Sequence, residues 1–504
     1  MLLPIVAVAV TVLLINCYSI AYRIARPYTL SPWESMIVVD AHRASQGQPI
    51  YQPLDRGAPA PHIYGPLMTH VVALVFRVTG PNLYAARVIS LIAALIACAI
   101  LIRIYVDYRK PFDLLFGAAL MLSLQCRSRA YFVESRPDMI AWLLATLALI
   151  CFYRAHHRNA FGRWYPLGLA LVILTFLSKQ TYACFAAVPL VAILVLQPRP
   201  LRKHLLFAML PLVCLGLTVI VLKQVQPVLY HYMVKVPKMY AIPLDRLKVA
   251  WDILIMSIPL YPAAVVGYFV RLRHDPDGDA PVAWLAPKMI WLMAACGVGF
   301  AAAVMAFGKQ FATINSLLLA WIPMTVFCCI VIPSLVRGLY RSAIAGLALP
   351  PLGNFALHFS GAFLIASLTF VTAFSSGKDG FNWDLGHGTR EYKHVIAAVK
   401  DLSGRVVSPE DPTIPLFANG YIGRNLDAEL DATNHGAIPQ SVLAEVSRAH
   451  WLVHVTAGYK SQISERLLKT WGFKRYRTFG RGYSLWLHTG IGERKSPTTQ
   501  RTSP

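Results

Sequence analysis

Apolar runs of about 20 residues recur along most of this chain, and they restrict its fold more than any other feature. A helix of that length crosses the hydrocarbon core of a bilayer, which is roughly 30 Å thick. The hydrophobic fraction of 56% and the charged fraction of 14% fit such a chain, because a soluble protein of 504 residues needs more polar surface. We predict about 11 spans, near residues 2–22, 83–107, 112–127, 137–154, 164–178, 180–197, 204–224, 249–271, 285–307, 312–336 and 355–374. The predicted fold is therefore a polytopic α-helical membrane protein.

The charged residues predict how these helices cross the membrane. The chain has 47 Lys and Arg against 24 Asp and Glu, which gives a formal net charge of +23. Short basic segments fall on one side of the predicted bilayer, at residues 108–110, 154–163, 199–204, 271–274 and 337–341. Cytoplasmic loops collect Lys and Arg, so we place this side and the amino terminus in the cytoplasm and everything after residue 375 outside. The enrichment of Lys and Arg in cytoplasmic loops explains the net positive charge, so we do not predict a nucleic-acid partner. We expect the inner membrane of a bacterium, with the endoplasmic reticulum as the alternative.

The nine cysteines all lie in or at the ends of apolar segments, so no disulfide framework is predicted. No set of His, Cys, Asp or Glu has the spacing of metal ligands, and no glycine-rich phosphate loop is present. The sequence therefore predicts no cofactor and does not indicate a metal ion.

Composition divides the chain into three parts. Residues 1–375 hold the predicted spans and a long first external loop at 23–82. Residues 376–490 are polar and rich in turn residues, and alternating short elements there predict a small α/β domain outside the membrane. Residues 491–504 form a basic tail that we predict to be disordered.

Six segments of the predicted α/β domain have a clear pattern. The expected helices are REYKHVIAAVKDL (390–402) and SVLAEVSRA (441–449). The expected strands are RVVSP (405–409), IPLFA (414–418), HWLVHVT (450–456) and GYSLWLH (482–488). Ser408, Glu410 and Asp411 are predicted to form a turn or cap and not a catalytic set.

The first external loop contains SPWE at residues 31–34, which is typical of a helix N-terminus. Ser is a favoured N-cap, Pro suits the first helical position, and Glu two positions later reaches back to the N-cap amide. We predict a helix from Pro32 to about Gln46 and a second, amphipathic helix from Pro66, both at the membrane surface. Glu34 is thus either a helix cap or a group that the loop presents for chemistry.

Asp40 is a second carboxylate in the same predicted helix. It lies six residues after Glu34, which is roughly 120° around a helix of 3.6 residues per turn. The two side chains therefore do not share a face and make a poor acid/base pair. Arg43 follows Asp40 at i+3, so a local ion pair is the alternative to a catalytic role.

Three basic residues fall on the same predicted side as this loop. Lys179 interrupts an otherwise apolar stretch, and ionisable residues in membrane segments are costly and usually functional. Arg136 comes just before Asp138, and Lys309 lies in the turn before the tenth span. Simpler interpretations are that Lys179 snorkels at a turn and that Arg136 pairs with Asp138 or Glu134.

Several motifs occur in an order that resembles the GT-C superfamily of membrane glycosyltransferases. The nearest likeness is to the branch that includes protein O-mannosyltransferases and the bacterial aminoarabinose transferase that modifies lipid A. The resemblance covers roughly residues 1–375. Its motifs are GQPIY (47–51), YGPL (64–67), AARVISLIAAL (85–95), RPDMIAWLL (136–144), LSKQTY (177–182) and GKQFATINSLLLAWIP (308–323).

The resemblance implies a reaction and a catalytic base. Enzymes of this superfamily transfer a sugar from a polyprenyl-phosphate carrier to an acceptor on the non-cytoplasmic face, and inversion is expected for this branch. Glu34 aligns with the acidic residue of the family's first loop, which implies that it is the general base. Many relatives carry Asp-Glu where this chain has Trp33-Glu34, so Asp40 stays a second candidate.

The resemblance also implies how the donor is held. The leaving group is a membrane-anchored phosphate, and cations are needed to stabilise it. The candidates for contact with the donor phosphate are Arg136, Lys179 and Lys309. The candidates for other contacts with substrate are His62, Tyr64, Asp138 and Asn315. No metal site is predicted, although the amino-sugar branch can bind a divalent ion. The sugar moved and the kind of acceptor (glycan, lipid or protein) are left open.

Two other function classes compete with the transferase. A transporter or flippase of a lipid-linked or small anionic substrate would explain Lys179, but such proteins commonly have repeated halves, and no internal repeat is seen. A non-catalytic scaffold that presents the C-terminal domain is the third possibility.

Overall fold

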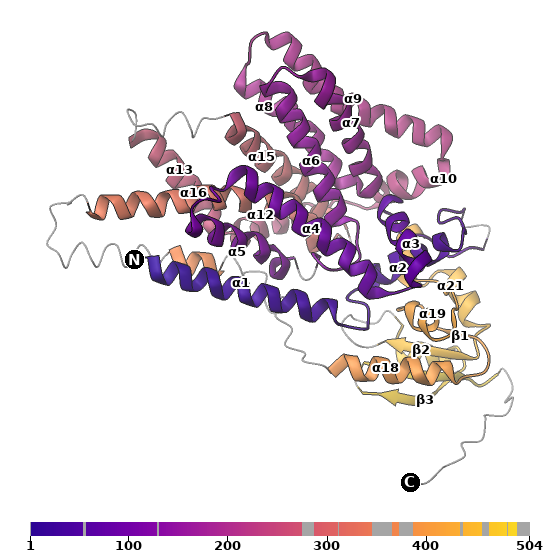
Figure 1. Ribbon diagram of the computed structural model, residues 1–504. Coiled ribbons are helices and arrows are strands. Elements are labelled where there is room, and N and C mark those ends of the chain that lie inside the picture. The colour runs from indigo at the N-terminus through magenta and orange to yellow at the C-terminus, as the bar shows by residue number, and fades with distance from the viewer. Residues whose placement is uncertain are drawn as a thin grey trace. The chain divides into compact units, whose positions relative to one another are not determined.

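The computed structural model describes residues 2–53, 57–128, 131–274, 287–310, 312–344, 365–371, 387–433, 437–455, 463–480 and 482–490 (Figure 1). The chain forms two compact units. The first, here called the membrane unit, comprises Met1–Ala25, Tyr64–Val71 and Tyr84–Trp383. The second, here called the loop–sheet unit, comprises Arg26–Ile63, Val72–Leu83 and Asp384–Pro504. Most of the first external loop thus belongs to the same unit as the C-terminal region.

Within the described residues, seven helices are long and apolar enough to cross a membrane, or eight if one bent pair is counted as a span. The bent pair is α12 (Leu244–Ser257) and α13 (Leu260–His274), with a bend of 72°. The seven are α1 (Leu2–Ile24), α4 (Leu83–Tyr105), α6 (Asp138–His157), α7 (Phe161–Ser178), α9 (Leu201–Val225), α15 (Pro287–Gly308) and α16 (Leu318–Ile344), which continues the short η4 (Ile314–Leu317). The prediction of a multi-pass, helical membrane protein is confirmed.

The remaining predicted spans are shorter or lie partly outside the described residues. Apolar helices below spanning length occur at α5 (Pro111–Arg127) and at η2 (Gln180–Ala187) with α8 (Val188–Leu196). Of the predicted span at 355–374, only 365–371 is described, and it is helical. The predicted tail at 491–504 lies outside the described residues.

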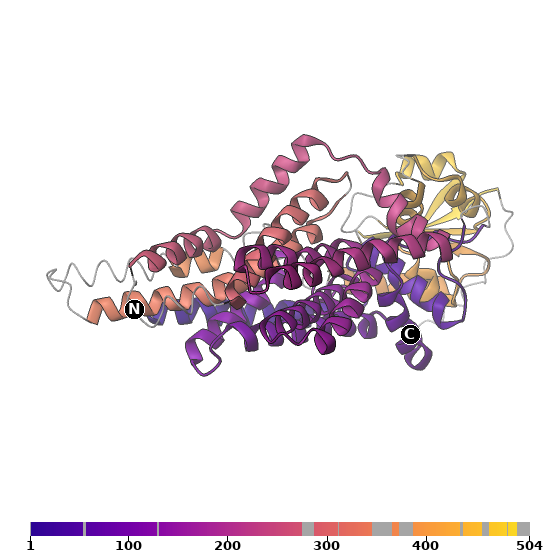
Figure 2. The same ribbon diagram turned by 90° about the horizontal axis from the view of Figure 1, so that it is seen from above.

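Packing within the membrane unit joins helices that are close in sequence and helices that are distant. Figures 1 and 2 show α6 and α7 side by side, and α15 packs against α16. α1 packs against α5, and α5 also contacts α16. The short elements α10 (Pro227–Tyr230), η3 (His231–Lys235) and α11 (Val236–Met239) follow α9.

Both helices predicted in the first external loop are present. α2 runs from Pro32 to Ser45 and α3 from Leu67 to Thr79, close to the expected boundaries. Ser31 has an extended backbone and its Oγ accepts the Glu34 N–H at 3.3 Å, as an N-cap does.

The C-terminal region forms a four-stranded sheet in the order β1-β2-β4-β3. β1 (Val406–Val407) is parallel to β2 (Trp451–Val455), whereas β4 (Tyr483–His488) is antiparallel to β2 and to β3 (Phe473–Phe479). The helices are α18 (His387–Lys400), α19 (Thr413–Asn419), α20 (Leu426–Thr433), α21 (Gln440–Val446) and α22 (Glu465–Thr470). Val407, Leu452, Phe473 and Trp486 form the centre of one apolar core.

One predicted strand is wrong, and one strand was not predicted. IPLFA lies in α19, because a short apolar run has the same pattern in a buried strand and in one face of a short helix. Asp411 Oδ1 accepts the Thr413 N–H at 3.1 Å at the start of this helix, and Gly420 ends it with a φ of 75°. β3 has five consecutive exposed residues after Phe473, so it lacks the alternation that marks a strand.

Candidate active site

A buried polar cluster lies at one end of α6 in the membrane unit. Asp138 is the first residue of α6, and its Oδ1 accepts a hydrogen bond from Lys179 Nζ at 2.5 Å. The same oxygen accepts a bond from Asn315 Nδ2 at 3.3 Å. Lys179 follows the last residue of α7 and Asn315 lies in η4, so three separate helices bring these side chains together.

Arg136 completes this cluster from the segment before α6. Its NH2 donates to Tyr64 Oη at 2.6 Å, and its Nε lies 3.6 Å from Asp138 Oδ2. Its NH1 lies 3.7 Å from Glu134 Oε1, and the guanidinium stands 4.7 Å from the centre of the Tyr131 ring. The ion pairing that the sequence allowed for Arg136 is therefore present, with both carboxylates.

The YGPL motif has a structural explanation in this cluster. The Gly65 N–H donates to Ser178 O at 3.2 Å, and a Cβ on Gly65 would lie only 1.9 Å from Leu177 O. Only glycine permits this approach, which places the Tyr64 ring 5.2 Å from Lys179 Nζ.

The cluster carries balanced charge, because Arg136 and Lys179 face the carboxylates of Glu134 and Asp138. Tyr182 has a buried hydroxyl with no hydrogen-bond partner among the described residues, and its ring lies 6.0 Å from Lys179 Nζ. An anion that enters here would compete with the two carboxylates for Arg136 and Lys179. A charge-assisted hydrogen bond from either cation to a phosphate oxygen is strong in a buried site.

The structure gives Lys309 a different neighbourhood. Its Nζ donates to Pro237 O at 3.0 Å, and the nearby Gln310 N–H donates to Ala241 O. No contact within the described residues joins Lys309 to Arg136 or Lys179. Of the three predicted phosphate contacts, two therefore lie together.

Glu34 and Asp40, with His62, lie in the loop–sheet unit. Glu34 is fully buried, and its Oε2 accepts the Leu30 N–H at 2.7 Å. We predicted that the Glu34 carboxylate would accept the N–H of the N-cap, Ser31. It instead accepts the N–H of Leu30, the residue before the N-cap. Glu34 thus stabilises the start of α2, as the capping interpretation requires.

Asp40 has the local partner that the sequence predicted. Arg43 NH1 donates to Asp40 Oδ1 at 3.0 Å, and Asp40 Oδ2 accepts the His62 N–H at 3.1 Å. Burial raises the pKa of Asp40 to about 6, although Arg43 and the His62 amide act in the opposite direction. A carboxyl group with this pKa is better suited to accept a proton near neutral pH than one at its ordinary value.

The C-terminal region supplies contacts to the first loop that sequence reasoning missed. Asp411 Oδ2 accepts a bond from Thr29 Oγ1 at 2.9 Å, and Asn425 Nδ2 donates to Ser35 Oγ at 2.8 Å. Residues so distant in sequence carry no local signal of their contact. Asp411 Oδ1 also accepts the N–H of Thr413, the first residue of α19, whose N-cap position is occupied by Pro412.

Asp411 makes stability depend on pH. Burial raises its pKa from 3.8 to about 6, and the Glu34 carboxylate adds to the rise, while bonds from Thr413 and Thr29 oppose it. A raised pKa means that the folded chain holds this proton more tightly. The contribution to stability is thus full below pH 4 and is lost as the pH rises through about 6.

Replacing Asp411 with Asn is expected to raise the free energy of unfolding at pH 8 by about 2 kcal/mol and to change it little at pH 4. The amide oxygen keeps the bonds from Thr413, and the amide nitrogen can donate to Thr29. Thermal unfolding of the full chain at pH 4, 6 and 8 measures the effect. Identical pH dependence in the two proteins would contradict the assignment.

The described residues contain no group of three or more His, Cys, Asp or Glu that could hold a metal ion.

Residues 61–231 match the family described as Dolichyl-phosphate-mannose-protein mannosyltransferase. A comparison with curated proteins found no match.

The fold is similar to that of ArnT from Cupriavidus metallidurans. In the apo state the TM-score is 0.55, with 14% identity over 96% of this chain and 97% of that chain. For ArnT bound to undecaprenyl phosphate the TM-score is 0.52, with 14% identity over 95% and 97% of the two chains. At this identity the likeness shows a shared fold. Taken with the family match at 61–231, it confirms the likeness that the motifs indicated: the chain resembles the GT-C superfamily of membrane glycosyltransferases in fold and in this segment.

Proposed function

We propose that this protein transfers a sugar from a polyprenyl-phosphate carrier to an acceptor on the non-cytoplasmic face of the membrane, with inversion at the sugar. One observation carries the proposal. The family-matched segment, 61–231, supplies Tyr64, Arg136, Asp138 and Lys179 to a single buried cluster.

In this proposal Arg136 and Lys179 hold the donor phosphate. Guanidinium offers a planar pair of donors and ammonium a compact charge, and both bind phosphate oxygens well. Asp138 and Glu134 hold the two cations in place before the donor arrives. The solved complex of ArnT with undecaprenyl phosphate supports a lipid phosphate as the ligand class.

A largely apolar cavity within the membrane unit supports a lipid-linked donor. Its volume is about 210 Å³, and its lining comes from α4, α6, η2, α15 and α16. Trp142 lines it and lies four residues, or one helical turn, after Asp138 in α6. Apolar side chains such as Leu149, Leu292 and Val326 make up most of the remaining lining, which also includes Arg154 and Lys288. A cavity of this kind suits an isoprenoid tail, because the burial of apolar surface is favourable and needs no specific polar contact.

A carboxylate of the first loop is the proposed general base, with Glu34 the first candidate and Asp40 the second. The base takes the proton from the acceptor group, and the acceptor atom then forms a bond to the anomeric carbon. The bond from that carbon to the phosphate oxygen breaks, and the phosphate leaves with the electron pair.

Mass spectrometry of cell-envelope glycolipids and glycans tests this function. Cells that lack the gene are expected to lose a glycosylated product and to accumulate the polyprenyl-phosphate sugar, and the intact gene is expected to restore both. An unchanged set of glycans and lipid-linked sugars in the deleted strain would exclude the transferase.

A further inference from the structure

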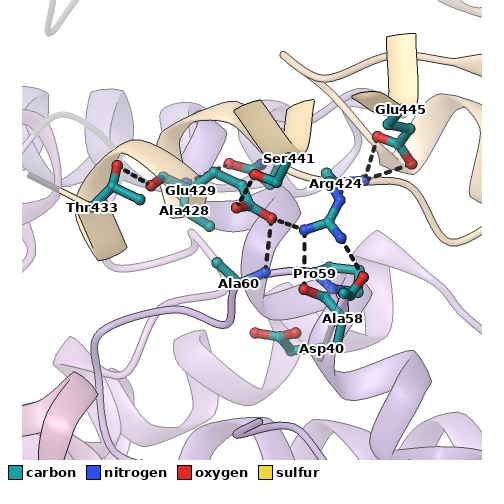
Figure 3. A network of polar contacts seen from close by, with 12 residues as sticks. Asp40, Ala58, Pro59, Ala60, Arg424, Ala428, Glu429, Thr433, Ser441 and Glu445 are labelled. Atoms are coloured by element: carbon teal, nitrogen blue, oxygen red, sulfur yellow. Dashed lines mark hydrogen bonds and ion pairs between the residues drawn. The ribbon is translucent and has the colours of Figure 1, made fainter. Parts of the chain in front are cut away.

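The segment Gly57–Ala60 of the first loop is held by side chains of the C-terminal region (Figure 3). Glu429 Oε1 accepts the Ala60 N–H at 3.0 Å. Arg424 NH1 donates to Ala58 O at 3.0 Å, and Arg424 NH2 donates to Gly57 O. Both side chains thus bind backbone groups of one short loop segment.

These two side chains are themselves fixed within the C-terminal region. Glu429 is fully buried, and its Oε2 accepts a bond from Ser441 Oγ at 2.7 Å. Arg424 NH1 donates to Glu429 Oε1 at 2.5 Å, and the Arg424 N–H is shared between the two carboxylate oxygens of Glu445 (Figure 3). A charge pair with this many partners, in which Glu429 is buried and Arg424 partly buried, has little freedom to move.

The other side of the same loop segment meets α2. Arg43 NH1 contacts Pro59 O at 3.4 Å and also donates to Asp40 Oδ1. Two residues after Ala60, the His62 N–H donates to Asp40 Oδ2. Residues 57–62 therefore form a bridge from Glu429 to Asp40, all within the loop–sheet unit.

We propose that Arg424 and Glu429 are positioning residues, which set the backbone of Gly57–Ala60 and through it the placement of Asp40 and His62 for the transfer reaction. The inference rests on the proposed function, because it assigns the first-loop carboxylates to the acceptor step. Neither residue lies in the family-matched segment, and neither needs to touch substrate.

The electrostatics of Asp40 give this role a distinct signature. The groups that face Asp40 are Arg43 from α2 and Tyr51 and His62 from the loop. Burial is the main cause of its raised pKa, and the carboxyl group accepts the His62 N–H at one end of the bridge. A loosened bridge admits water, and the pKa of Asp40 then falls toward its ordinary value. When Asp40 is protonated, it loses its ion pair with Arg43. The transfer rate is therefore expected to fall at acid pH as Asp40 takes up its proton, whether Glu34 or Asp40 is the base.

The test uses the full-length protein with Arg424→Gln, the conservative Arg424→Lys, and Arg475→Gln as a control. Arg475 pairs with Glu465 on the surface of the same unit and has no part in the bridge. Hydrogen exchange of the amides at 57–62 reports on the bridge without any substrate. Transfer of the native sugar, followed as a function of pH, reports on the reaction.

Arg424→Gln is expected to speed exchange at Ala60 and His62, to lower transfer by about 10- to 100-fold and to move the acid limb to lower pH. Arg424→Lys is expected to restore part of each effect, and Arg475→Gln to change none. Unchanged exchange would overturn the bridge. Faster exchange with an unchanged rate and pH profile would overturn the positioning role. If the unmodified protein transfers no sugar, the proposed function fails, and the exchange data still decide whether the bridge exists.

Discussion

Replacing Glu34 with Gln is expected to lower sugar transfer by at least about 100-fold, because a general base contributes roughly 10²- to 10⁴-fold to a rate. Gln cannot take the acceptor's proton. Its side-chain oxygen can still accept the Leu30 N–H, and Gln also occurs at this position of a capping box. The melting temperature should therefore stay within a few degrees of the unmodified protein, as measured by thermal unfolding beside the transfer assay.

Asp40→Asn is the matched comparison for Glu34→Gln. It leaves buried Arg43 without its carboxylate, so we expect loss of stability together with loss of activity. Full activity in Glu34→Gln together with an inactive but stably folded Asp40→Asn would move the base to Asp40. Full activity in both variants would contradict a first-loop base.

Asp138→Asn is expected to lower the free energy of unfolding by roughly 3 kcal/mol and to abolish transfer. The substitution leaves Lys179 and Arg136 with one carboxylate between them in a buried cluster, and breaking a buried ion pair costs about 3 to 5 kcal/mol. Removing the unmatched cation as well, in Asp138→Asn with Lys179→Gln, is expected to restore most of the stability.

The double variant separates a structural role of this cluster from a role in binding the donor. Its charges are again balanced, since Arg136 keeps Glu134, yet one of the two proposed phosphate ligands is gone. Transfer should therefore stay low while folding recovers. If the double variant regains both stability and transfer, Lys179 and Asp138 serve folding alone.

Local interactions were predictable from the sequence because they depend on residues a few positions apart. The N-cap of α2, its length and the Asp40–Arg43 pair all follow from spacing within one helix. The apolar spans follow from length and composition in the same way. Short elements were harder, since the five residues of IPLFA fit a strand as well as the helix α19.

Contacts between distant segments could not be predicted from one sequence. Arg424 meets Ala58 across 366 residues, and the approach of Gly65 to Leu177 depends on how two helices pack. For Arg136 and Lys179, the sequence left functional and structural interpretations open. The structure shows that both are ion-paired at helix ends, so Lys179, the feature that favoured a transporter, is accounted for by its bond to Asp138.

Binding of undecaprenyl phosphate to the purified protein, measured by native mass spectrometry, tests most directly whether the buried cluster holds a lipid phosphate. The comparison is between the Asp138→Asn, Lys179→Gln double variant and a control in which another ion pair of the membrane unit, Asp113 with Arg337, is replaced by Asn and Gln. We predict that the first variant binds at least about tenfold more weakly than the unmodified protein, as one lost charge-assisted bond implies, and that the control binds normally. Equal binding by all three proteins would contradict the account.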